Sequence, residues 1–103
     1  MDTSLLETSL SAAASRLEGT AGGEIPTREI IENLHVCEQE LVAKRFVRQR
    51  DQFGGVRVLR VPGIEAALIH VSQALTDLKV RSVENARSNI EGAIEDLAAV
   101  VNN

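Results

Sequence analysis

The stretch that decides the fold is residues 64–101, "IEAALIHVSQALTDLKVRSVENARSNIEGAIEDLAAVV". Apolar residues recur in it at alternating intervals of four and three, at Ile64, Leu68, Val71, Leu75 and Leu78 and then at Val83, Ala86, Ile90, Ala93, Leu97 and Val100. This spacing puts apolar side chains on one face of an α-helix. Because only the short link "KVR" separates the two series, we predict two helices, about 64–78 and 83–101, packed as an antiparallel hairpin.

Two further helices are predicted upstream, at about 4–18 and 27–44. Their apolar stripes are Leu6, Leu10, Ala13 and Leu17, and Ile30, Leu34, Cys37 and Leu41. Ser4 and Glu7 have the spacing of an N-terminal capping box. The second stripe ends at Lys44 and Arg45, where its continuation would put charge in the core. The chain, 1–103, is therefore expected to form a single, mainly α-helical domain, with Gly-rich residues 20–26 as a link.

Residues 45–63, "RFVRQRDQFGGVRVLRVPG", break the helical pattern. Two β-prone segments flank "DQFGG", so a β-hairpin is predicted at about 46–61, between the second and third helices. A five-residue loop would set Val47 opposite Leu59, whereas a turn at the Gly pair would set Phe53 opposite Val56. Continuation of the second helix to Gly54 is a third alternative, and the sequence leaves all three open.

The segment from Thr27 to Phe46, "TREIIENLHVCEQELVAKRF", resembles a helix-turn-helix. Apolar residues stand at the positions that hold this motif together: Ile30, Leu34, Val36 and Leu41. With the following hairpin as a wing, residues 27–61 resemble the winged helix-turn-helix superfamily. The resemblance implies a turn at "HV", residues 35–36, and contact between the hairpin arginines and DNA phosphates.

Several positions depart from the pattern of that family. Ile31 stands where a small residue is usual, and His35 stands where Gly is usual. Glu38 and Glu40 begin the segment that would enter the major groove, where carboxylates face phosphates. The net charge of −4 also argues against a protein that coats nucleic acid non-specifically.

Catalytic, cofactor and metal sites are not expected. His35 and Cys37 are two residues apart, so a helix points them to different faces, and no further Cys or His cluster completes a zinc site. Nothing places His70 near Cys37 as a base. The Gly pairs lack the spacing and the Lys of a phosphate loop. The single cysteine and the lack of an apolar run near 18 residues predict a soluble, cytoplasmic protein without a membrane span.

One charged cluster is the main candidate for a binding site. Its members are Lys44, Arg45, Arg48, Arg50, Arg57 and Arg60. Arginine binds carboxylates and phosphates bidentately, so the cluster is expected to contact an acidic protein surface or a nucleic-acid backbone. Basic residues on a strand can also serve only to prevent edge-to-edge aggregation.

A second expected surface lies on the C-terminal helices. Apolar residues beside or at the end of the main stripes would mediate self-association: Ile69, Ile94, Leu97 and Val101. The sequence thus predicts a non-catalytic protein-binding or assembly module that forms a homo-oligomer and docks through the arginine-rich hairpin or a helical face. The alternative is a winged-helix-like nucleic-acid-binding regulator with a C-terminal dimerisation hairpin.

Overall fold

The computed structural model describes residues 2–18 and 27–101. The described chain contains helices α1 (Ser4–Glu18), α2 (Thr27–Lys44), α3 (Pro62–Lys79) and α4 (Val83–Val101), with strands β1 (Phe46–Arg50) and β2 (Val56–Arg60) between α2 and α3. The predicted fold class and order of elements are confirmed, and α3 begins two residues before its predicted start. The expected link at residues 20–26 lies outside the described residues.

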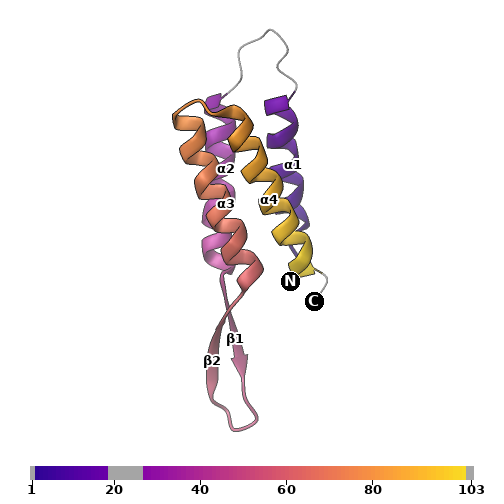
Figure 1. Ribbon diagram of the computed structural model, residues 1–103. Helices are drawn as coiled ribbons and strands as arrows, with labels where there is room; N and C mark the ends of the chain where they lie inside the picture. The colour runs from indigo at the N-terminus through magenta and orange to yellow at the C-terminus, as the bar shows by residue number, and fades with distance from the viewer. Residues whose placement is uncertain (1, 19–26, 102–103) are drawn as a thin grey trace.

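The four helices form an up-down-up-down bundle (Figure 1). Around the ring, α1 packs on α2 and α4, and α3 packs on α2 and α4. The most extensive of these interfaces joins α3 and α4, as predicted for the C-terminal helical hairpin. The β-hairpin projects from the end of the bundle at which α2 ends and α3 begins (Figure 1). It makes the molecule elongated, with principal extents of 61 × 23 × 17 Å.

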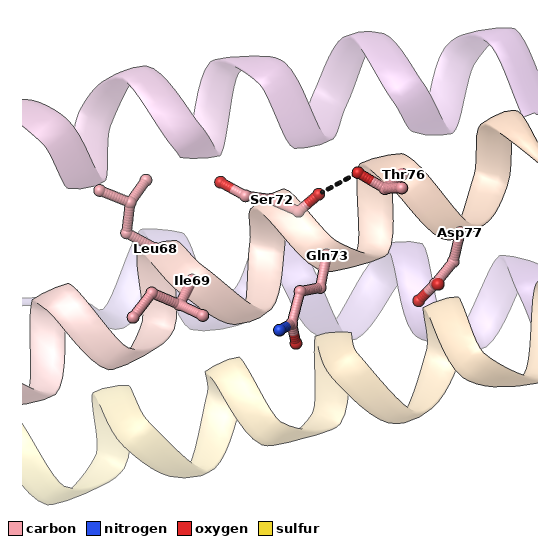
Figure 2. A pocket seen from close by; sticks show the side chains of 6 residues that line it. All are labelled: Leu68, Ile69, Ser72, Gln73, Thr76 and Asp77. Atoms are coloured by element: carbon pink, nitrogen blue, oxygen red, sulfur yellow. Dashed lines mark hydrogen bonds between the residues drawn. The ribbon is translucent and has the colours of Figure 1, made fainter.

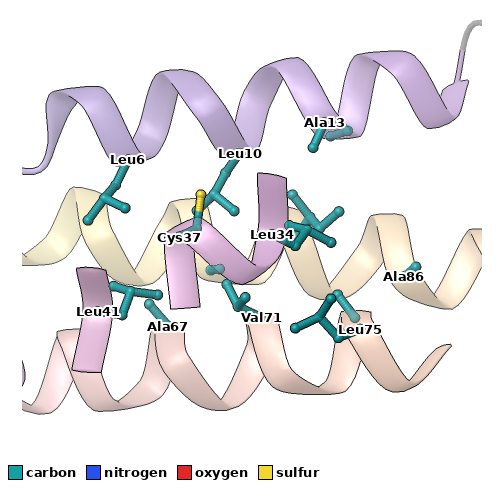
Figure 3. Close-up of a cluster of buried hydrophobic side chains, with 14 of the residues drawn as sticks. Leu6, Leu10, Ala13, Leu34, Cys37, Leu41, Ala67, Val71, Leu75 and Ala86 are labelled. Atoms are coloured by element: carbon teal, nitrogen blue, oxygen red, sulfur yellow. The ribbon is translucent and has the colours of Figure 1, made fainter. Parts of the chain in front are cut away.

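One apolar core runs through the bundle (Figure 3). The predicted stripes of α1 and α2 are buried at every position: Leu6, Leu10, Ala13, Leu17, Ile30, Leu34, Cys37 and Leu41. In α3 the prediction needs one correction, because Ala67 and Ala74 are fully buried while Leu68 is only half-buried. The buried face of α3 is centred on Ala67, Val71 and Ala74, so Leu68 lies at the edge of that face.

Two glycines allow α3 and α4 to approach closely. A Cβ atom on Gly63 would lie 2.3 Å from Val100 Cγ2, well inside van der Waals contact. A Cβ atom on Gly92 would lie 3.0 Å from His70 Nε2. The His70 ring therefore packs over Gly92, and its Nδ1 lies 2.6 Å from Asp96 Oδ2. This contact ties the middle of α3 to the C-terminal half of α4.

Local hydrogen bonds define helix ends. At the start of α1 the capping residue is Thr3 rather than Ser4: its carbonyl accepts a hydrogen bond from Glu7 N at 2.9 Å, and its hydroxyl donates to the Glu7 carboxylate at 3.3 Å. The cap thus lies one residue before the predicted one, and Ser4 is the first residue of the helix.

The end of α3 has the bonding pattern of a Schellman motif. Ser82 N donates to Asp77 O at 2.8 Å, and Arg81 N donates to Leu78 O at 3.1 Å. Arg81 therefore adopts a φ of 60°, a left-handed conformation that L-residues with a Cβ adopt at a cost. The motif reverses the chain so that α4 can return along α3.

The turn implied by the helix-turn-helix resemblance is not formed. Helix α2 runs without a break from Thr27 to Lys44, through His35 and Val36. Its buried stripe passes continuously from Leu34 to Cys37, and no Gly or Pro interrupts the helix there. In the part of the chain that the structure describes, no helix has the length and apolar character needed to cross a membrane.

Candidate interaction surface

The β-hairpin is an arm with both faces in solvent. Strands β1 and β2 pair only with each other, and every one of their residues is exposed. Val47 pairs with Leu59, so the register is the one given by the five-residue loop at residues 51–55. Phe53 lies in that loop with 88% of its surface exposed. The alternative register and the continuation of α2 to Gly54 are therefore wrong.

The loop is held by its own residues. The Asp51 carboxylate oxygen Oδ1 accepts hydrogen bonds from Phe53 N at 2.9 Å and from Gly55 N at 2.7 Å. Asp51 N donates to Gly55 O at 2.8 Å, which closes the loop. Gly54 has a φ of 84°, a conformation that favours glycine. The hairpin therefore needs no contact from the bundle to set its turn.

The register divides the hairpin side chains between two faces, because residues directly opposite one another share a face and alternate residues do too. One face, here called the arginine face, consists of Phe46, Arg48, Arg50, Val56, Val58 and Arg60. The opposite face holds Val47, Gln49, Arg57 and Leu59. The arginines predicted as one cluster are thus split: three share a face with three apolar residues, and Arg57 points the other way.

The remaining basic residues of the cluster lie at the base of the arm. Lys44 ends α2 and is half-buried. Arg45 is half-buried, its guanidinium carbon lies 4.9 Å from the centre of the Phe46 ring, and its buried Nε has no hydrogen-bond partner among the described residues. Arg60 Nε lies 3.7 Å from Glu65 Oε1 on α3. Within the described chain, Arg48 and Arg50 make no ion pair, so their charges are available to a partner.

A second surface feature consists of two shallow pockets that share Leu68 and Ser72, one on α3 (Figure 2) and one between α2 and α3; together they are here called the α2–α3 groove. It is lined by Glu38, Gln39 and Val42 of α2 and by Leu68, Ile69, Ser72, Gln73, Thr76 and Asp77 of α3. Its apolar side chains are partly or largely exposed, with Ile69 at 58%. The sequence interpretation missed this groove, although the surplus apolar residue Ile69 was a signal for it.

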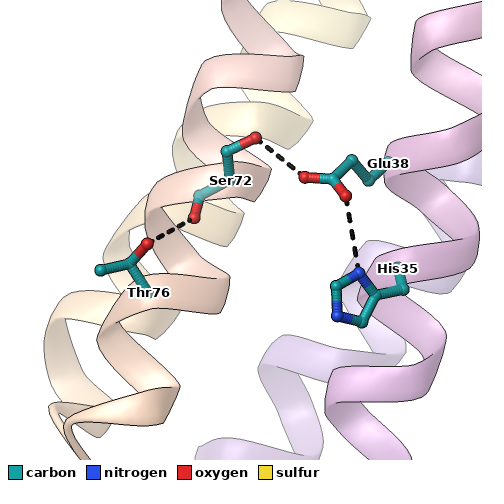
Figure 4. A network of polar contacts seen from close by, with 4 residues as sticks. All are labelled: His35, Glu38, Ser72 and Thr76. Atoms are coloured by element: carbon teal, nitrogen blue, oxygen red, sulfur yellow. Dashed lines mark hydrogen bonds and ion pairs between the residues drawn. The ribbon is translucent and has the colours of Figure 1, made fainter.

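Two carboxylates of the groove are fixed by hydrogen bonds. Glu38 accepts a hydrogen bond from the Ser72 hydroxyl at 3.0 Å and lies 3.5 Å from His35 Nδ1, so it bridges α2 and α3 (Figure 4). Asp77 accepts a hydrogen bond from the Asn89 side-chain amide at 2.7 Å. A carboxylate has lone pairs for several donors, so both groups can also accept hydrogen bonds from a partner.

The residues expected at a self-association face differ in how far they are buried and in where they lie on the bundle. Ile69 is exposed and lines the α2–α3 groove. Ile94 is half-buried against the core, and Leu97 is fully buried within it. Leu97 therefore lies inside the bundle, because α4 faces both α1 and α3. The side chain of Val101 lies outside the described residues.

The groups considered for chemistry are dispersed. Cys37 is buried in the core, and burial raises the pKa of its thiol to about 11, which keeps the reactive thiolate scarce. His35 is exposed on another face of α2, and His70 contacts Asp96. Over residues 2–18 and 27–101, no three His, Cys, Asp or Glu side chains gather as metal ligands would. The surfaces with distinctive chemistry are thus the arginine face and the α2–α3 groove.

Comparison with known proteins adds no relative: no protein-family model matches the sequence, and no match was found among curated proteins or solved structures.

Proposed function

We propose that this chain is a non-catalytic protein-binding and assembly module that docks through the arginine face of its β-hairpin onto an acidic protein surface. One observation carries the proposal: the hairpin holds three arginines and three apolar residues on one face, all exposed, on an arm that contributes nothing to the bundle core. An isolated two-stranded hairpin is only marginally stable in water. Such an arm gains order when a partner covers it.

The composition of the arginine face suits a protein partner. Arginine forks bind carboxylates with two parallel hydrogen bonds, and they are enriched where interfaces derive most of their affinity. Phe46 and the two valines supply apolar area between these charges. A phosphate backbone would use the charges but would leave this apolar area without a counterpart.

Neutralising the arginine face tests the proposal. In the test variant Arg48, Arg50 and Arg60 are replaced by Gln, and Arg57→Gln on the opposite face is the matched control. Exposed ion pairs contribute only about 0–1 kcal/mol each, so the thermal midpoint of the triple variant should stay close to that of the wild type. Capture of protein partners from a nuclease-treated native lysate should be lost in the triple variant and retained in the control.

Two results would contradict the proposal. If the triple variant unfolds, the arginines are structural. If it folds and captures the same proteins as the wild type, the arginine face is a solvated surface that only prevents aggregation.

A second candidate function is a nucleic-acid-binding regulator in which the hairpin serves as a wing, as in winged-helix proteins, while α2 is a single unbroken helix. Arg48 and Arg50 favour it, because their guanidinium groups lie on one face without a carboxylate partner in the described chain. With three phosphate contacts, a plot of the logarithm of the DNA association constant against the logarithm of the salt concentration should have a slope of about −2.7. Retention on DNA at physiological salt with that slope, lost in the triple variant, would support this candidate. Absence of retention favours the protein-binding proposal.

An intracellular location is part of the proposal. The sequence has one cysteine, and its thiol is buried and unpaired. A chain that does not rely on disulfides is typical of reducing compartments.

A further inference from the structure

We propose that the acidic surface that receives the arginine face is the α2–α3 groove of a second copy of this chain, and that two copies exchange hairpins about a two-fold axis. This inference rests on the proposed function and names the partner. It requires that the arginine face and the groove match in charge, in apolar content, in position on the molecule and in length. Each requirement can be checked on the structure.

The charges of the chain are divided between the arm and the bundle. The arm together with its base, residues 44–60, carries six basic side chains and one acidic side chain, a net charge of +5. Since the whole chain carries −4, the other residues carry −9. The arm of one copy and the bundle of another therefore attract each other, whereas two bundles alone would repel.

The two surfaces also match in detail. The groove offers the apolar side chains Val42, Leu68 and Ile69 together with the carboxylates Glu38 and Asp77. The arginine face offers Phe46, Val56 and Val58 among Arg48, Arg50 and Arg60. Each surface thus presents apolar groups beside charges of one sign, and the signs are opposite.

The arginine face and the groove lie on the same side of the molecule. Arg60, on the arginine face, contacts Glu65 at 3.7 Å. Glu65 shares one stripe of α3 with Leu68 and Ser72, because residues three and seven positions apart on a helix lie on one face, and both of these line the groove. A single continuous surface therefore carries both halves of the contact. Such a surface can pair with its own copy through a two-fold axis, which closes the assembly at a dimer.

The spacings along the two surfaces agree. From Phe46 to Arg50, β1 advances about 13 Å at roughly 3.3 Å per residue. From Leu68 to Asp77, α3 advances about 13.5 Å at 1.5 Å per residue. A two-fold axis perpendicular to the bundle lays the arm of one copy along α3 of the other in the same chain direction. If Phe46 of one copy lies over Leu68 of the other, Arg50 of the first copy reaches the level of Asp77 of the second.

Reversing the charge of Arg50 or of Asp77 tests the inference. The oligomeric state of the full chain would be measured by sedimentation equilibrium from about 1 to 100 μM. The wild type should be a dimer that weakens with salt. Arg50→Glu and Asp77→Arg should each weaken dimerisation by about tenfold or more, because each sets like charges against each other. An equimolar mixture of the two variants should recover it, since both contacts of the mixed dimer again join opposite charges.

Matched controls separate docking from folding. Arg57→Glu reverses a charge on the other hairpin face, and Glu95→Arg reverses one on the exposed side of α4. Asn89→Ala removes the hydrogen bond to Asp77 but leaves its charge. All three should dimerise as the wild type does. Far-UV circular dichroism should show the same helical content in every variant.

Three outcomes would overturn the inference: a wild-type monomer at every concentration, a dimer insensitive to both reversals, or single variants that the mixture does not rescue. Growth of the mixture beyond a dimer would also overturn it, because it would show an open head-to-tail chain. The proposed function is judged separately. If the chain is monomeric but the arginine-face variant still loses partners from a lysate, docking stands and the partner is another protein.

Discussion

Replacing Leu75 by Ala should destabilise the bundle far more than replacing Ile31 by Ala, although both changes remove three carbon groups. Leu75 is only 5% exposed and belongs to the main core (Figure 3). At about 0.8 kcal/mol per buried carbon group the transfer cost is roughly 2.4 kcal/mol. The cavity that remains adds to this cost, so the expected loss is about 3–4 kcal/mol, inside the range of roughly 2–5 for such changes.

Ile31 is half-buried at the edge of the core. Water fills the space that truncation leaves there, and Ala has a higher helix propensity than Ile by a few tenths of a kcal/mol. The expected loss is therefore about 1 kcal/mol. The gap of about 2–3 kcal/mol between the two variants exceeds the error of a denaturation experiment.

Urea unfolding followed by circular dichroism is the suitable assay, since the chain has no Trp or Tyr for fluorescence. With a slope near 1.5 kcal/mol per molar urea, the midpoint of Leu75→Ala should fall about 1.3–2 M below that of Ile31→Ala. Equal midpoints would refute the reasoning. They would mean that α2 is rotated so that Ile31 lies between helices, as the helix-turn-helix resemblance implies.

The remaining predictions concern the individual residues Arg81, Cys37 and Gly92. Arg81→Gly should raise the free energy of unfolding by about 1 kcal/mol, because glycine adopts its φ of 60° without penalty; a lower thermal midpoint would contradict this. The Cys37 thiol should resist a thiol-specific reagent at pH 8 until the chain unfolds, and rapid native labelling would disprove its burial. Because burial raises the pKa of the Cys37 thiol from its ordinary value of 9.0 to about 11, this group should make unfolding easier as pH rises from 9 to 11. Gly92→Ala should lower the midpoint by crowding the His70 ring, and His70→Ala should relieve most of that loss; additive losses would argue against the contact.

The helices were predictable because their stripes are set by local periodicity. Leu6, Leu10, Leu34 and Leu41 recur at helical intervals, and all four are buried. Periodicity alone does not show which residues lie at the centre of a buried face and which lie at its edge. The regular spacing placed Leu68 in the seam, but contacts of α3 with both α2 and α4 leave it at the rim of the groove.

The register of the hairpin could not be chosen from the sequence, since Val and Arg alternate in a way that suits both registers. The deciding interaction is the Asp51 carboxylate, which accepts hydrogen bonds from two loop amides and fixes a five-residue loop. Once that register is known, the alternation of side chains along each strand puts Arg57 on the opposite face from Arg48 and Arg50. The candidate site therefore depended on one side-chain interaction that composition and periodicity do not reveal.

The self-association residues show a related difficulty. Ile94 and Leu97 are both apolar residues of α4; the sequence interpretation counted both among the self-association residues, although Leu97 also belongs to the predicted apolar stripe. The structure buries Leu97 fully and Ile94 in part. Which apolar residue faces outward depends on the angle at which α4 meets α1 and α3, and this angle is set by packing across the bundle.

In the proposed function the β-hairpin binds another protein and does not help the bundle to fold. The most direct test is the free energy of unfolding of a chain in which residues 46–60 are replaced by a short Gly-Ser loop, measured at a concentration where the wild type is monomeric. Helix connections of about 2–8 residues are common in bundles, so α2 and α3 can still pack. We expect a free energy of unfolding within about 1 kcal/mol of that of the wild type, since the hairpin residues are exposed on both strands. A loss as large as that of Leu75→Ala would contradict it and make the hairpin part of the fold.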